Sequence, residues 1–227
     1  MKLLLLGTAR EKSTRIKHKM IRPFAESSLY QIYLSKFEAI VKTKHPFDNI
    51  GMAINRSEKT LWKLSRGTTV PIIERGRRST QMRKRAEELY FLKDRKEDYV
   101  MWVNGCFPFL KLETIIKTAV FFKSNKNRIK SLTAVRKKYN WYWHLKTGRP
   151  INNKNPRCVS TQKSPPILET IHCFHIFDRK HLLKTNSYWN LKENDPYLYL
   201  FKNSIEFLDI DEELDFKVCE ALWKRTK

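Results

Sequence analysis

A run of four leucines, Leu3 to Leu6, stands near the start of the chain and leads directly into a strongly basic stretch. A continuous apolar run of this length, ended by Gly7, is typical of a strand buried on both faces of a parallel sheet. The basic stretch, residues 8–22, is then the loop at the carboxyl end of that strand. Nucleotides bind at this end of the strands in open α/β sheets, so the two segments together predict a phosphate-binding site.

The side chains of this loop suit a triphosphate. Arginine offers paired N–H donors to phosphate oxygens, lysine offers a point charge, and Ser13 adds a hydroxyl or backbone donor. The loop has neither the GxxxxGK[ST] pattern of a Walker loop nor the GxGxxG pattern of a dinucleotide site. A solvated basic loop without a ligand is the alternative. The cationic residues are Arg10, Lys12, Arg15, Lys17 and Lys19.

Strand and helix patterns alternate through the first half of the chain, which predicts crossover connections and a mainly parallel sheet. Pro71 has no backbone donor, so the strand that contains it is expected at a sheet edge or as a loop. Ser27 or Ser28 is the expected cap of the first helix. We expect strands at residues 49–55, 69–73 and 99–103. The first helix should run from this cap to about Thr43, and further helices are expected at 58–65, 80–92 and 114–122.

The second half changes character, with a polar segment at residues 148–164 that is interpreted as a loop or a protruding arm. An aromatic cluster, Tyr139 to Trp143, is expected to alternate along a strand and to mix core and interface contacts. The length of 227 residues suits one domain. We expect further strands at 129–135, 139–145, 171–177 and 205–210, and helices at 180–184 and 212–224.

The charge of the chain points to an anionic partner. It has 46 basic and 23 acidic residues, a formal net charge of +23. A charged small molecule or a nucleic acid would suit this balance, and a solvated lysine-rich surface is the plain alternative. The densest basic patch is Arg75 to Arg85. Because charge alone identifies nucleic-acid binding weakly, this partner is the less favoured one.

The cysteines and the N-terminus argue against a zinc protein and against a secreted or membrane-spanning one. Cysteines at positions 106, 158, 173 and 219 form no CxxC pair, so reduced thiols are expected rather than a zinc site. The leucine run is shorter than the apolar stretch of about 7–15 residues in a signal peptide or about 20 in a spanning helix. We therefore expect a soluble, cytoplasmic protein.

An acidic motif, Asp209-Ile210-Asp211, lies near the other end of the chain. On the strand expected at 205–210, residues two apart project from the same face. Two carboxylates on one face suit Mg²⁺, which takes one or two protein carboxylates together with water and phosphate oxygens. The alternative is an acidic helix N-terminus, where negative side chains favour the helix dipole.

The two ends of the chain resemble the sugar-acid cytidylyltransferases, which make CMP-sialic acid and CMP-Kdo. Ala9-Arg10-x-x-Ser13-Thr14-Arg15 is similar to the Kdo branch, whereas Lys19 and Ile21-Arg22-Pro23-Phe24 are more similar to the sialic acid branch. Leu208 to Asp215 resembles the acidic motif of the family. The resemblance implies a three-layer, Rossmann-like α/β fold with a mixed, mainly parallel sheet of the nucleotide-sugar transferase type and a small dimerisation arm.

The resemblance also implies roles for individual residues. Arg10, Ser13 and Lys19 would hold the phosphates of CTP, with Arg15 beside them, and Arg10 and Lys19 would offset charge on the leaving group. Arg75 stands where the family places an arginine that contacts the cytidine. The remaining implied roles are sugar binding by Asn104, Gln162 and Glu169, and metal binding by Asp209 and Asp211.

Several positions depart from the family pattern. Small residues are usual where Glu11 and Lys12 stand, Met20 replaces a common asparagine, and Cys106 stands where the Kdo branch offers an aspartate ligand. A catalytically altered relative that binds nucleotide is therefore a second alternative. The resemblance otherwise implies Mg²⁺-dependent transfer of CMP from CTP to an acidic sugar, with release of pyrophosphate. Its expected assembly is a homodimer in which residues 136–170 serve dimerisation or the sugar site.

Overall fold

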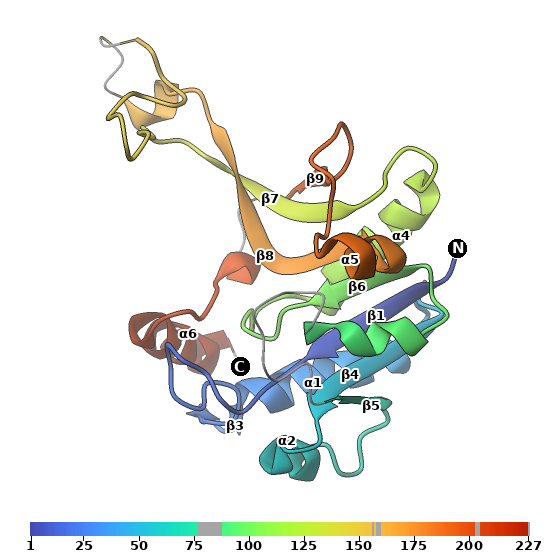
Figure 1. The fold of residues 1–227 in the computed structure, drawn as a ribbon. Helices are drawn as coiled ribbons and strands as arrows, with labels where there is room; N and C mark the ends of the chain where they lie inside the picture. The colour runs from blue at the N-terminus through green and yellow to red at the C-terminus, as the bar shows by residue number, and fades with distance from the viewer. Residues whose placement is uncertain (77–87, 156, 158–159, 203–204, 227) are drawn as a thin grey trace.

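The structure is a computed structural model that describes residues 1–76, 88–155, 157, 160–202 and 205–226 (Figure 1). Its centre is a seven-stranded sheet in the order β5-β4-β1-β6-β8-β7-β9, with helices on both faces. The three-layer, mixed-sheet α/β architecture expected from the sequence is thereby confirmed. The strands are β1 (Leu3–Thr8), β4 (Asn49–Asn55), β5 (Ile72–Arg75), β6 (Tyr99–Val103), β7 (Leu132–Lys138), β8 (Ile167–Asp178) and β9 (Tyr197–Leu200).

The leucine run forms β1, at the centre of the parallel part of the sheet. Leu5 pairs with Ile50 of β4 on one side and with Met101 of β6 on the other. Alternate leucines face opposite layers, and all four are fully buried. Leu3 and Leu5 pack into the larger core under α1 (Leu29–Val41), α4 (Leu112–Asn125) and α6 (Glu213–Thr226). Leu4 and Leu6 pack into the smaller core near η2 (Tyr90–Asp94) and α5 (Arg179–Thr185).

Most elements of the first half follow the sequence pattern. β4 and β6 have the expected bounds, and β5 begins just after Pro71 at the edge of the sheet. Helix α1 begins after Ser28, whose hydroxyl accepts a hydrogen bond from the Gln31 backbone N–H. Helix α2 (Lys59–Leu64) also forms as expected, while most of the helix expected at 80–92 lies outside the described residues. A short hairpin of β2 (Pro23–Phe24) and β3 (Ser27–Ser28) was not expected from the sequence.

The strand expected at 139–145 is wrong. β7 ends at Lys138, opposite the start of β8, and the chain continues into an arm that protrudes from the body (Figure 1). Here a short antiparallel bridge between Trp143 and Pro150, together with side chains, satisfies the backbone. The Tyr142 N–H donates to Asn152 Oδ1, and the Asn152 amide donates to the Asn140 carbonyl. The arm also contains η3 (Thr161–Lys163).

The strand expected at 205–210 is also wrong. β9, which the sequence did not indicate, takes the edge place beside β7. The later segment forms the turn η4 (Ile205–Phe207) and then runs across the body, where the Ile210 N–H donates to the Cys106 carbonyl. Asp209 and Asp211 are therefore in an extended loop before α6, so the shared-face argument of a strand does not apply. In the part of the chain that the structure describes, every helix is too short or too polar to cross a membrane.

Gly105 allows the loop after β6 to lie against α1. A Cβ atom at this position would come 2.6 Å from Tyr33 Cδ1 and 2.9 Å from Met20 Cε, both in the core. Overpacking of this kind costs about 1–3 kcal/mol, so Gly105→Ala should lower the free energy of unfolding by that amount in urea denaturation. Gly76→Ala is the matched control, because a Cβ there meets no atom of the described residues within 4 Å. Equal stability of the two variants would contradict the close packing.

Candidate active site

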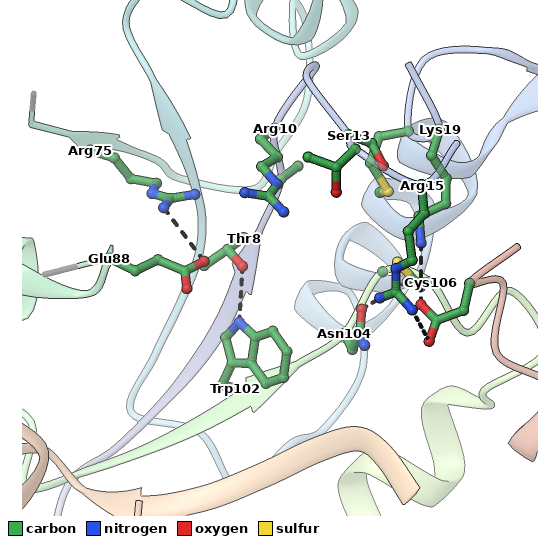
Figure 2. Close-up of a pocket in the computed structure, with 15 residues that line it drawn as sticks. Thr8, Arg10, Ser13, Arg15, Lys19, Arg75, Glu88, Trp102, Asn104 and Cys106 are labelled. Atoms are coloured by element: carbon green, nitrogen blue, oxygen red, sulfur yellow. Dashed lines mark hydrogen bonds and ion pairs between the residues drawn. The ribbon is translucent and has the colours of Figure 1, made fainter. Parts of the chain in front are cut away.

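A cavity of about 550 Å³ lies at the carboxyl ends of β1, β5 and β6 (Figure 2). Its floor and walls join the basic loop after β1, the loop after β6 and the acidic motif before α6. Seven of the residues singled out in the sequence line it: Arg10, Ser13, Arg15, Lys19, Arg75, Asn104 and Asp211. The further lining residues are Thr8, Ala9, Thr14, Met20, Glu88, Trp102, Gly105 and Cys106.

Lys19 connects the two ends of the chain. Its side chain is buried, and its ammonium group donates a hydrogen bond to the carbonyl of Ile210. The same Nζ lies 3.8 Å from Asp211 Oδ1, while Arg15 Nη1 lies 2.8 Å from Asp211 Oδ2. Figure 2 shows Arg15 and Lys19 at one end of the cavity. The basic loop and the acidic motif are thus parts of a single electrostatic cluster.

Helix α6 holds the far end of the basic loop. Arg22 forms an ion pair with Glu213, with 2.6 Å between Nη1 and Oε1, and its guanidinium lies 4.5 Å from the centre of the Phe216 ring. Phe24 packs edge-on against the same ring, with 5.3 Å between ring centroids. The match at Arg22-Pro23-Phe24 therefore marks residues that dock the loop on α6 rather than residues that line the cavity.

Glu11, a departure from the family pattern, has a structural position. One carboxylate oxygen, Oε1, accepts hydrogen bonds from the backbone N–H groups of Thr60 and Leu61, in the first turn of α2. The Glu11 N–H in turn donates to the carboxylate of Glu58. This carboxylate lies at the start of a helix, where a negative charge is favourable, and it therefore adds no negative charge to the cavity. Glu11 and Lys12 do not line the cavity, whereas Met20 and Cys106 do.

The two aspartates have different environments. Asp211 lines the cavity and pairs with Arg15 and Lys19, whereas Asp209 does not line it. Burial, and then the charge of Asp211, raise the pKa of Asp209 to about 6. Its Oδ1 atom is buried and has no hydrogen-bond partner among the described residues.

A buried, orphaned carboxylate oxygen next to a second carboxylate fits the hard oxygen donors that Mg²⁺ prefers. Within the described ranges, His, Cys, Asp and Glu nowhere form a group of three or more that could hold a metal. An ion at Asp209 and Asp211 would therefore need further oxygens from water or from a phosphate ligand, which is usual for Mg²⁺.

The opposite end of the cavity has a different chemistry. Arg75 and Glu88 form a buried ion pair, with 3.6 Å between Nη2 and Oε1. The indole N–H of Trp102 donates to Thr8 Oγ1 at 2.9 Å. The sequence analysis missed Glu88 and Trp102, although Trp102 lies on the strand expected at 99–103, two residues before Asn104. The other basic residues of the Arg75–Arg85 patch lie outside the described residues.

Two residues proposed for sugar binding lie elsewhere. Gln162 is exposed in η3 of the arm, and Glu169, on β8, pairs with Arg136 and Lys138 of β7. Neither lines the cavity, while Asn104 does, and its side-chain oxygen accepts from the Cys106 N–H. The thiol of Cys106 has its pKa raised by burial. Cys106, Cys173 and Cys219 are free thiols, and Cys158 is outside the described residues.

The Lys19 ammonium should contribute measurably to stability. In Lys19→Met the Ile210 carbonyl loses its donor and the aspartates lose a buried positive charge, a loss of about 2–3 kcal/mol for hydrogen bonds to a charged group. Urea denaturation should show this decrease in the free energy of unfolding. Lys17→Met, the same change at an exposed position outside the cavity, is the control. If both variants are as stable as the native chain, the connection through Lys19 is energetically unimportant.

Comparison with known proteins gives one sequence relative and several structural ones. No model of a known protein family matches the chain. Post-translational flagellin modification protein B of Campylobacter coli is 28% identical over 130 residues, 56% of this chain. The match covers 53% of that protein, so the chain spans about half the length of the curated relative.

Solved structures match almost the whole chain. A CMP:2-keto-3-deoxy-manno-octonic acid synthetase complexed with CTP has a TM-score of 0.66 at 9% identity, over 100% of both chains. A 4-diphosphocytidyl-2C-methyl-D-erythritol synthase from Anaerococcus prevotii has a TM-score of 0.65 at 15% sequence identity, and the match covers 99% of both chains. A cytidylyltransferase from Leptospira borgpetersenii has a TM-score of 0.61 at 17% sequence identity, and the match covers 99% of this chain and 87% of that one. The chain therefore has the α/β nucleotidyltransferase fold of the cytidylyltransferases, including CMP-Kdo synthetase.

Proposed function

We propose that this protein is a CTP-dependent cytidylyltransferase that joins CMP to an acidic, sialic-acid-like or Kdo-like sugar and releases pyrophosphate. The observation that carries the proposal is the cluster of Arg15, Lys19 and Asp211 in one cavity. It unites a basic loop after a central parallel strand with an acidic motif from the far end of the chain. The matches to a CTP-bound sugar-acid synthetase and to a flagellin modification protein support the substrates.

The basic loop would hold the triphosphate. Arg10, Ser13 and Arg15 line the cavity beside Lys19, so their donors can surround the phosphate oxygens. The sugar hydroxyl attacks the α-phosphorus, a new P–O bond forms, and the bond to the β-phosphate oxygen breaks as pyrophosphate leaves. Catalysis of such transfer depends on positioning and on neutralising developing charge. Arg10 and Lys19 would supply the positive charge nearest the leaving group.

Asp209 and Asp211 would hold Mg²⁺ between the acidic motif and the phosphates. The ion would neutralise phosphate charge and lower the pKa of a bound hydroxyl. Arg15 and Asp211 already form an ion pair that is substantially exposed, so its opening costs at most about 1 kcal/mol. The guanidinium is thereby free to move from the carboxylate to a phosphate oxygen when nucleotide enters.

The Arg75 end of the cavity would receive the nucleoside. Arg75 and Glu88 offer donors and acceptors on buried side chains, and Trp102 offers an aromatic face. A cytosine ring presents both donor and acceptor groups at its edge, which suits a mixed wall of this kind. Asn104, which lies between Trp102 and Arg15 in Figure 2, would contact the sugar.

The arm would complete the sugar site of a second subunit. Gln162 and Glu169 belong to the arm and its base and do not line the cavity of their own chain. The arm projects away from the body (Figure 1), so it is in a position to reach another molecule. We propose a homodimer in which these two residues approach the cavity of the partner subunit.

Asp211→Asn should remove CTP-dependent, Mg²⁺-dependent pyrophosphate release, because the amide lacks the charge that holds the ion. We expect kcat to fall by at least about 100-fold, similar to the loss of one group that stabilises transition-state charge. Turnover is measured with a panel of nonulosonic and octulosonic acids. Glu213→Gln is the control, since this carboxylate is outside the cavity and pairs with Arg22.

A thermal-shift screen over nucleoside triphosphates tests the nucleotide itself, because a ligand that binds the native state raises the melting temperature. CTP with Mg²⁺ should give the largest shift. No shift with CTP, and no turnover with any sugar acid, would refute the proposal. Tight, steeply salt-dependent binding of DNA or RNA instead would favour the nucleic-acid alternative. CTP binding without turnover by the native chain would identify a catalytically altered relative.

A further inference from the structure

The Asp211 carboxylate already has two cations of the basic loop beside it. Arg15 Nη1 lies 2.8 Å from its Oδ2 atom, and Lys19 Nζ lies 3.8 Å from its Oδ1 atom, so each oxygen has its own positive neighbour. All three residues line the cavity. A divalent cation bound to this carboxylate would therefore lie within a few ångströms of two like charges, which repel it.

The two cations differ in how easily they can leave the carboxylate. Lys19 is buried, and its ammonium group donates to the Ile210 carbonyl, so this charge is fixed. The Arg15 side chain is 62% exposed. Exposed ion pairs are weak because water competes for both charges. Arg15 is therefore the cation that can move away from Asp211.

The protein by itself offers a divalent ion few ligands and little charge. Asp209 adds a buried oxygen, Oδ1, which has no hydrogen-bond partner among the described residues. Within the same part of the chain, His, Cys, Asp and Glu form no group of three or more that could hold a metal. The two carboxylates are balanced by Arg15 and Lys19, so the charge around the site is near zero. A triphosphate would supply the missing oxygens and negative charge, as is usual for Mg²⁺.

We propose that Arg15 excludes the divalent cation from the site until a nucleotide binds, so that metal and triphosphate enter together; this inference rests on the proposed cytidylyltransferase function. Without nucleotide, the guanidinium lies at Oδ2 of Asp211. A triphosphate carries more negative charge than one carboxylate, and its oxygens accept paired hydrogen bonds from arginine. The guanidinium then moves to the phosphates, and the Asp211 oxygen becomes available to the ion.

Such an exchange makes the two ligands cooperative. Coupling between ligands is reciprocal, so the factor by which CTP raises the affinity for the metal is also the factor by which the metal raises the affinity for CTP. Arg15 contributes to this factor because it opposes the ion only while it lies at Asp211. Its removal should therefore strengthen the binding of metal alone and weaken the coupling.

Binding of Mn²⁺ without nucleotide tests the exclusion. Mn²⁺ takes the same oxygen ligands as Mg²⁺, and the electron paramagnetic resonance signal of the free ion gives the bound fraction. We expect the native chain to bind Mn²⁺ with a Kd of about 1 mM or weaker, and Arg15→Gln to bind it at least about 10-fold more tightly. Arg15→Lys, which keeps the charge, should resemble the native chain. Lys17→Gln is the control, because it removes one charge from an exposed position of the same loop outside the cavity.

Two further measurements locate the effect at Asp211 and measure the coupling. Asp211→Asn in the Arg15→Gln background should abolish the gain in Mn²⁺ affinity, because the amide cannot replace the carboxylate as a ligand. The affinity for CTP, measured with Mn²⁺ and with a chelator, gives the coupling factor. We expect a factor of about 5 to 150 for the native chain and a smaller one for Arg15→Gln.

A native Kd for Mn²⁺ well below the expected value, or equal Mn²⁺ affinities of the native chain and Arg15→Gln, overturns the inference while the proposed function stands. The same holds if Lys17→Gln gains as much affinity as Arg15→Gln, or if the coupling factor is unchanged in Arg15→Gln. A native chain that binds no CTP, with or without Mn²⁺, and turns over no sugar acid overturns the proposed function, and this inference with it.

Discussion

The candidate site depends on one buried ammonium group. Lys19 donates to the Ile210 carbonyl and lies near the Asp211 carboxylate, so it joins segments 191 residues apart in the sequence. A buried charge is tolerated only where polar partners replace its lost hydration. The pairing therefore fixes both partners, since neither the basic loop nor the acidic segment can move without leaving a charge or a carbonyl unsatisfied.

The remainder of the basic loop is held from both sides. Glu11 supplies acceptors to the first turn of α2, and Arg22 contacts Glu213 and Phe216 of α6. The loop contains only one described residue with a left-handed backbone, His18, at a φ of 57°. Its shape is thus imposed mainly by side-chain contacts with neighbouring helices, and not by the glycines that phosphate-binding loops use.

Strands that are marked by their own residues were predicted correctly from the sequence. The prediction failed where two segments compete for the same place in the sheet. β4 and β6 were predicted with their bounds, because each is an apolar run between clear turn residues. Residues 205–210 are less apolar, with Glu206 and Asp209 among them; β9 takes the sheet edge, and the later segment bonds to Cys106. The cavity residues were found mostly by resemblance to a family. Trp102 was missed because its orientation depends on neighbours distant in sequence.

The central position of β1 has a consequence for the order in which the protein can fold. Its partners β4 and β6 begin more than 40 residues later, and the carbonyl that satisfies Lys19 comes only at residue 210. Contacts between such distant segments require closure of long loops, which slows folding. The sheet core can assemble as soon as β6 exists, whereas the basic loop stays unanchored until the last helix docks. The proposed nucleotide site should therefore form late in folding, after most secondary structure has formed.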